Sequence, residues 1–113
     1  KPKAPGQLKS HYAPRRALRL VGFGGLAEAH PEGKAAAVFF DGASRSRAGT
    51  AVERFADVRV LTEAGDVTEA AANLFDLLHE LDQGDYDELW AERVPDGGIG
   101  AAINDRLYKA SKK

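Results

Sequence analysis

The chain of 113 residues has no cysteine, no methionine and no long apolar run, and each absence narrows what it can be. Without cysteine it can form neither disulfides nor thiolate metal sites, a composition that fits a cytoplasmic protein. No apolar stretch approaches the roughly 20 residues that cross a bilayer, and none follows the first residues as in a secretory signal, so we expect no membrane partner. Because synthesis starts at methionine, its absence leads us to expect a piece of a longer protein.

Groups that carry chemistry are also sparse. The histidines are His11, His30 and His79. They lack neighbouring ligands at metal-binding spacing, so we expect neither a metal nor a cofactor bound by this chain. Ser10 beside His11 is adjacency in a loop rather than a positioned nucleophile and base. Asp76 and Glu80, four residues apart, are typical of a solvated helix face. We therefore expect no catalytic residue in this chain.

The charge is unevenly distributed although the net charge is only −1. Ten of the 16 lysines and arginines lie in residues 1–20 and 106–113, which contain no acid. The other six share residues 21–105 with all 17 acidic residues, so this middle part carries a net charge near −11. The basic ends are either solvated tails or, at the N-terminus, a strap that meets a nucleotide or pyrophosphate. The acidic middle argues against direct binding of nucleic acid.

Hydrophobic patterning predicts an α/β fold with about four mostly parallel strands, because strands and helices alternate along the chain. The strands are expected at 17–21, 35–40, 58–61 and 87–92, and the two main helices at about 66–82 and 100–110. Trp90 in the last strand is expected in the core or at the sheet edge. The segment 42–50 is rich in Ser, Arg, Gly and Ala, which predicts a mobile surface loop, with a helical turn at 51–55.

The helix at 66–82 has the clearest signals. Asp66 and Glu69 form an Asp-x-x-Glu capping box, in which each side chain reaches the backbone N–H of the other. Four leucines follow at i, i+3, i+4 and i+7, which places them on one face. They are Leu74, Leu77, Leu78 and Leu81. Gly84 is a natural stop after the helix.

A glycine-rich segment follows the first strand. Residues 22–27 match Gly-x-Gly-x-x-Ala, and Asp41 lies at the end of the next strand, as in a dinucleotide-binding fingerprint. That fingerprint needs a helix long enough to cross the sheet with its N-terminus on the pyrophosphate. Pro31 leaves too little room for such a helix, so we favour a glycine-rich loop.

Residues 1–16 predict an extended linker, since the prolines at 2, 5 and 14 bias their neighbours away from helix. His11 and Tyr12 are hard to explain as core residues in such a segment. A segment that folding does not explain is a candidate for function. The alternative is a passive tail.

Three segments resemble one family. Pro5-Gly6 and His11-Tyr12-Ala13-Pro14 resemble the interdomain linker, roughly Ser-Pro-Gly-Met…His-Tyr-Ala-Pro, of two-domain L-threonylcarbamoyladenylate synthases, although Ala4 and Gln7 replace its Ser and Met. Residues 70–82 resemble the family's Ala-Ala-x-x-Leu-Phe-x-x-Leu-Arg-x-Leu-Asp helix, with His79 in place of Arg. Residues 98–107 resemble its Gly-Leu-Gly-x-Ala-Ile-x-(Asn/Asp)-Arg-Leu.

The resemblance implies an interdomain linker at 1–16 and a Rossmann-like C-terminal accessory domain at 17–113. The family condenses L-threonine, bicarbonate and ATP into threonylcarbamoyl-adenylate and pyrophosphate, a nucleotidyl transfer that serves tRNA modification. Its chemistry, with ATP and Mg²⁺, lies in an N-terminal YrdC-like domain absent from this chain, which would be the partner of this domain, with tRNA contacted only indirectly. By resemblance, the strap that closes the active site comprises Pro5, Gly6, Lys9, His11, Tyr12 and Pro14.

Two other functions stay open from the residues alone. A helix directly after Gly25 would favour an autonomous nucleotide-binding domain built on residues 22–27. A large exposed apolar patch would favour a protein-interaction module.

Overall fold

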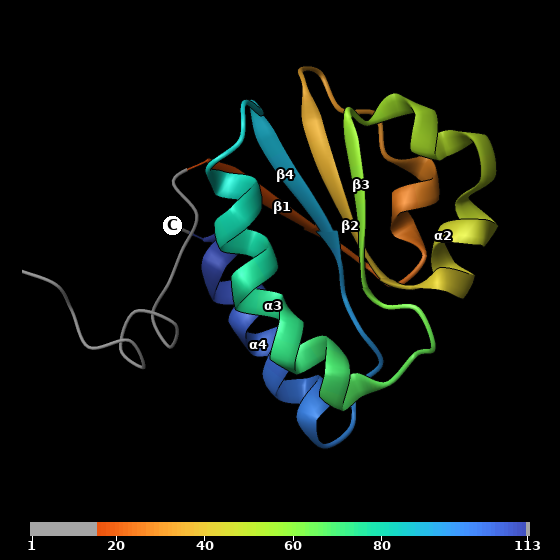
Figure 1. The fold of residues 1–113 in the computed structure, drawn as a ribbon, viewed down its shortest axis with the longest axis vertical. Coiled ribbons are helices and arrows are strands. Elements are labelled where there is room, and N and C mark those ends of the chain that lie inside the picture. The colour runs from red at the N-terminus through yellow and green to blue at the C-terminus, as the bar shows by residue number, and fades with distance from the viewer. Residues whose placement is uncertain (1–15, 113) are drawn as a thin grey trace, which may run out of the picture.

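The computed structural model describes residues 16–112, which form a four-stranded sheet flanked by helices (Figure 1). The strands are β1 (Ala17–Val21), β2 (Ala35–Asp41), β3 (Asp57–Thr62) and β4 (Glu88–Glu92). Their order in the sheet is β1-β4-β2-β3, and all three pairings are parallel. The predicted α/β class is confirmed, and the arrangement is consistent with a Rossmann-like fold.

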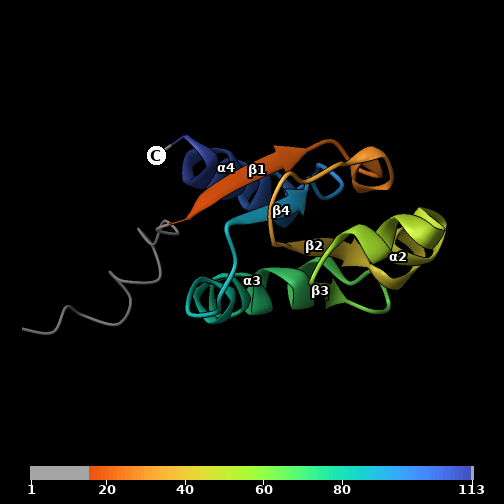
Figure 2. The same cartoon turned by 90° about the horizontal axis from the view of Figure 1, so that it is seen from above.

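Helices cover both faces of the sheet (Figure 2). The elements are η1 (Gly25–Glu28), α2 (Gly42–Ala48), η2 (Gly49–Arg54), α3 (Val67–Asp82) and α4 (Ile99–Ser111). The two predicted main helices, α3 and α4, lie on one face, and the shorter α2 with the two 3-10 helices lies on the other. The sheet therefore has one face with long helices and one with short helical turns.

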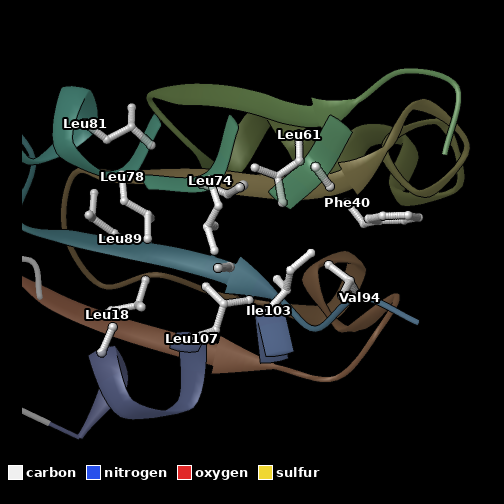
Figure 3. Packing of buried hydrophobic residues seen from close by; sticks show 14 of the residues in the cluster. Leu18, Phe40, Leu61, Leu74, Leu78, Leu81, Leu89, Val94, Ile103 and Leu107 are labelled. Atoms are coloured by element: carbon white, nitrogen blue, oxygen red, sulfur yellow. The ribbon is translucent and has the colours of Figure 1, made fainter. Parts of the chain in front are cut away.

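The larger core lies between α3, α4 and the sheet (Figure 3). Leu74, Leu78 and Leu81 of α3 are at most 2% exposed. They meet Leu89 and the inward residues of the other strands, while α4 contributes buried Ile103 and Leu107. The predicted leucine face is confirmed with one correction. Leu77 is only half-buried, because it lies at the margin of the stripe that faces the sheet.

The smaller core lies on the opposite face, where β2 contributes Ala35, Ala37 and Phe39. The small alanine side chains allow the short helices to approach the sheet closely, and Leu26 of η1 is completely buried there. Trp90 is half-buried on this face and meets the ring of Phe55 edge-on, with 6.3 Å between ring centroids. The expectation of a core or sheet-edge role for Trp90 is confirmed.

The expectation of a mobile loop at 42–50 is wrong, because this segment forms α2 and the start of η2. The Asp41 carboxylate caps α2 by accepting from the backbone N–H of Ser44 at 2.9 Å. Ser44 is itself buried, and Ala48 packs into the smaller core. This helix depends on a cap and on tertiary contacts, so it carries little hydrophobic periodicity for sequence reasoning to detect.

The cap of α3 forms as predicted on one side only. The Asp66 carboxylate accepts from the backbone N–H groups of Thr68 and Glu69 at 2.9 and 3.3 Å. Glu69 does not bind the Asp66 N–H directly but through Thr62 of β3. The Thr62 hydroxyl accepts from the Asp66 N–H at 3.0 Å and donates to Glu69 at 2.5 Å. The cap therefore ties the start of α3 to the end of β3.

Candidate functional site

The predicted strap residues lie outside the residues that the structure describes. They are Pro5, Gly6, Lys9, His11, Tyr12 and Pro14. The described chain begins at Arg16, at the amino ends of the parallel strands, directly before β1. The opposite edge, where the strands reach their carboxyl ends, is where open α/β sheets bind ligands.

The glycine-rich segment after β1 makes a tight turn at this carboxyl edge. The backbone N–H of Gly25 donates to the carbonyl of Gly22 at 2.8 Å, and Gly24 has a φ of 83°, which favours glycine. The element that follows is η1, a 3-10 helix of only four residues. The long helix that a dinucleotide fingerprint requires is therefore not formed after Gly25, as the position of Pro31 predicts.

Glu92, the last residue of β4, lies at this edge. It is only 1% exposed. One carboxylate oxygen accepts from the N–H of Gly24 at 2.9 Å and from the hydroxyl of Ser44 at 2.8 Å. The other oxygen accepts from the N–H of Phe40 at 2.6 Å. The loop after β1, the end of β2 and the start of α2 thus all donate to one internal carboxylate.

This arrangement differs from a dinucleotide-binding fingerprint in two respects. The backbone N–H of Gly24, which would face a phosphate in a Rossmann nucleotide site, already binds a protein carboxylate, and a phosphate placed beside that carboxylate would meet like charge. Asp41, which matched the ribose-binding acid of the fingerprint, is engaged as the cap of α2. Sequence reasoning missed Glu92, although an acid that ends an otherwise buried strand is a signal that could have found it.

Two acids, Asp87 and Glu88, bind the turn before β2 at the amino edge of the sheet. Asp87 accepts from the backbone N–H of Lys34 at 2.8 Å, and Glu88 accepts from the N–H of Gly33 at 3.4 Å. Glu88 also binds the guanidinium of Arg19 at 2.7 Å. Burial of Glu88 opposes its ionisation, but the hydrogen bonds from Arg19 and the turn, with the charge of Arg19, outweigh it and lower its pKa. These contacts fasten the turn before β2 to the start of β4.

The C-terminal motif at 98–107 has a structural explanation. Gly98 has a φ of 54°, and a Cβ on Gly100 would collide with the carbonyl oxygen of Pro95. The buried Asn104 accepts from the N–H of Val94 and donates to its carbonyl, each at 2.8 Å. The motif therefore holds the connection from β4 to α4 in place.

The other candidate groups do not form a site. His30 and His79 are exposed on separate elements, and Glu80 binds Arg59 at 3.3 Å on the surface. Residues 16–112 contain no group of three or more side chains placed to hold a metal ion. Within the same residues, no helix combines the length and apolar character needed to cross a membrane.

Among residues 16–112, the large apolar side chains that are exposed are Phe23, Ile99 and Tyr108. Ile99 borders an apolar hollow of about 170 Å³ between α3 and α4. Phe23 belongs to the turn after β1, and Tyr108 to the last turns of α4. The interaction-module interpretation, which needs one large exposed patch, stays a hypothesis.

Comparison with known proteins decides the family. The profile described as "Threonylcarbamoyl-AMP synthase, C-terminal domain" matches residues 1–112. The chain belongs to the threonylcarbamoyl-AMP synthase C-terminal domain family. It is 32% identical over 118 residues to the threonylcarbamoyl-AMP synthase of Bacillus subtilis (strain 168), covering 98% of this chain and 32% of that protein. It is also 32% identical over 124 residues to the enzyme of Pyrococcus abyssi (strain GE5 / Orsay), covering 96% and 32%.

The resemblance to this family is therefore confirmed. The chain spans about a third of the length of these relatives. The match extends over residues 1–15, the carboxyl edge of the sheet and both motif-bearing helices.

Proposed function

We propose that this chain is the accessory domain of a threonylcarbamoyl-AMP synthase and does not carry out the chemistry by itself. The observation that carries the proposal is the family match over residues 1–112, in a chain that spans only about a third of its relatives. The reaction is the condensation of L-threonine, bicarbonate and ATP into threonylcarbamoyl-adenylate and pyrophosphate, for tRNA modification in the cytoplasm. An N-terminal YrdC-like domain would supply the nucleotidyl-transfer site with its ATP and Mg²⁺.

The carboxyl edge supports a role without a nucleotide of its own. Glu92 already binds the Gly24 N–H of the glycine-rich segment, and η1 is too short to present a helix N-terminus. An autonomous nucleotide-binding domain built on residues 22–27 is therefore disfavoured. The acidic middle of the chain makes a direct contact with the tRNA backbone unfavourable, so tRNA is served through the product alone.

The linker is proposed to close the active site of the catalytic domain. His11 and Lys9 can donate to anionic oxygens of ATP or pyrophosphate, and the Tyr12 ring can exclude water. Gly6 permits close approach of the backbone to a ligand, and Pro5 and Pro14 bias their neighbours away from helix. Closing segments of this kind exclude water from the reaction and complete the catalytic site.

The test is the double variant His11→Ala/Tyr12→Ala in the full-length protein. We expect turnover to fall, because the strap loses its anion donor and its ring, while the thermal midpoint stays nearly unchanged. His30→Ala is the matched control, since His30 is exposed in a turn of the domain and should leave both quantities unaltered. Normal turnover in the double variant would reduce the linker to a tether and refute the closing role.

A further inference from the structure

Arg16, the residue directly before β1, is bonded to the far end of α3. Its backbone N–H donates to Asp82 Oδ1 at 3.3 Å, and its Nε donates to the carbonyl of Tyr86 at 2.5 Å. Its Nη1 donates to the carbonyl of Asp82 and to Asp82 Oδ1, the latter at 3.3 Å. In Figure 1 the start of β1 accordingly lies beside the C-terminal end of α3. One side chain thus joins the start of the sheet, the end of a helix and the loop before β4.

The burial of this contact separates it from ordinary surface pairs. The Arg16 side chain is 25% exposed and that of Asp82 only 2%. Exposed ion pairs contribute little to the stability of the fold. Removing one partner of a buried pair is more costly, because the remaining charge is left with fewer hydrogen bonds in a medium of low dielectric constant. Arg19, the other described cation of the basic N-terminal segment, has a side chain that is 57% exposed. Arg16 is therefore the better fixed of the two.

The planar guanidinium of Arg16 binds two segments of the chain at once. Strand pairing with β4 starts at Ala17, opposite Glu88, and so does not itself hold Arg16. Arg16 is held instead through its backbone N–H and two nitrogens of a planar fork, which fixes both position and direction of the chain at this point. A lysine ammonium on a flexible stem cannot reproduce a fork that reaches two segments.

We propose that Arg16 is a positioning residue that sets where and in which direction residues 1–15 leave the domain, with Asp82 and the Tyr86 carbonyl as its seat. This inference rests on the proposed function of the linker. A strap that must reach another domain binds there more readily when its last residue is held in place on this domain. Fewer conformations are then open to the free strap, so less entropy is lost when it closes. Asp82 closes the helix motif of residues 70–82, so the proposal also gives that position a role beyond the core.

The experiment measures the position of the linker root directly. The chain has no cysteine, so Ala13→Cys with Ala72→Cys, the latter on the exposed side of α3, provides the only two sites for spin labels. Pulsed electron paramagnetic resonance then gives the distribution of distances between the labels. We expect the distribution to be broader in both Arg16→Gln and Arg16→Lys than in the parent chain.

Arg59→Gln is the matched control. Arg59 of β3 binds Asp57 at 3.2 Å and Glu80 of α3 at 3.3 Å, so its loss removes a comparable set of contacts to the same helix without touching Arg16. The distribution should stay as narrow in this variant as in the parent chain, and thermal midpoints show whether each variant is folded. An equally narrow distribution in Arg16→Gln, or an equally broad one in the parent chain, would overturn the proposal.

The result is separable from that of the strap test. In the full-length protein, Arg16→Gln should lower turnover and Arg59→Gln should not. If His11→Ala/Tyr12→Ala turns over normally while Arg16→Gln still broadens the distances, the closing role fails and the anchor stands. If the distances do not change, the anchor fails whatever the double variant does.

Discussion

At the scale of single residues, the most consequential group is the Glu92 carboxylate. It accepts from two backbone N–H groups and one hydroxyl, and all three donors are buried with it or lie at its rim. Carboxylates with several such donors are held firmly, whereas loss of a partner leaves buried polar groups unsatisfied. Glu92 therefore joins the loop after β1, the end of β2 and the start of α2 at the edge where other Rossmann-like domains hold ligands.

Replacing this carboxylate should destabilise the domain. In Glu92→Gln an amide NH₂ faces at least one of the donors, so we expect a loss of roughly 1–3 kcal/mol in the free energy of unfolding. Glu63→Gln makes the same chemical change in an exposed pair with Arg45 and should cost at most about 1 kcal/mol. Urea denaturation of both variants checks the difference, and equal midpoints would contradict the buried role of Glu92.

At the scale of elements, α3 organises the larger core. Leu78 is 2% exposed against the sheet, while Leu77 is only half-buried at the margin. Leu78→Ala should therefore cost roughly 2–5 kcal/mol, the range for a fully buried leucine. Leu77→Ala should cost about 1 kcal/mol, since less apolar area is lost. Equal denaturation midpoints for the two variants would mean that the helix is rotated from the orientation described.

The elements also show what sequence reasoning can reach. Strong signals predicted β1, β2, α3 and α4 closely, since a buried apolar run, a capping Asp66 and a leucine stripe act locally. The helix α2 was missed because its stability comes from Asp41 and from Ser44 binding Glu92, a contact 48 residues away in sequence. Glu92 was missed for the same reason. Its three donors come together only when the sheet has formed.

At the scale of the whole molecule, the two edges of the sheet differ in what they bind. The carboxyl edge is closed by an internal carboxylate, and the amino edge holds Arg16 where the chain enters. The proposed function is therefore assigned to the linker and to a separate catalytic domain, and not to either edge of this sheet. The family could be inferred from three short motifs, whereas the closed edge and the anchor could be seen only in three dimensions.

The most direct test of this account measures threonylcarbamoyl-adenylate formed from L-threonine, bicarbonate and ATP with Mg²⁺, for this chain and for the full-length protein in parallel. We predict product from the full-length protein and none from this chain, because the proposed function places the nucleotidyl-transfer site in the N-terminal catalytic domain and Glu92 already binds the Gly24 N–H of the glycine-rich segment in this chain. Adenylate formed by the purified chain alone would contradict the account.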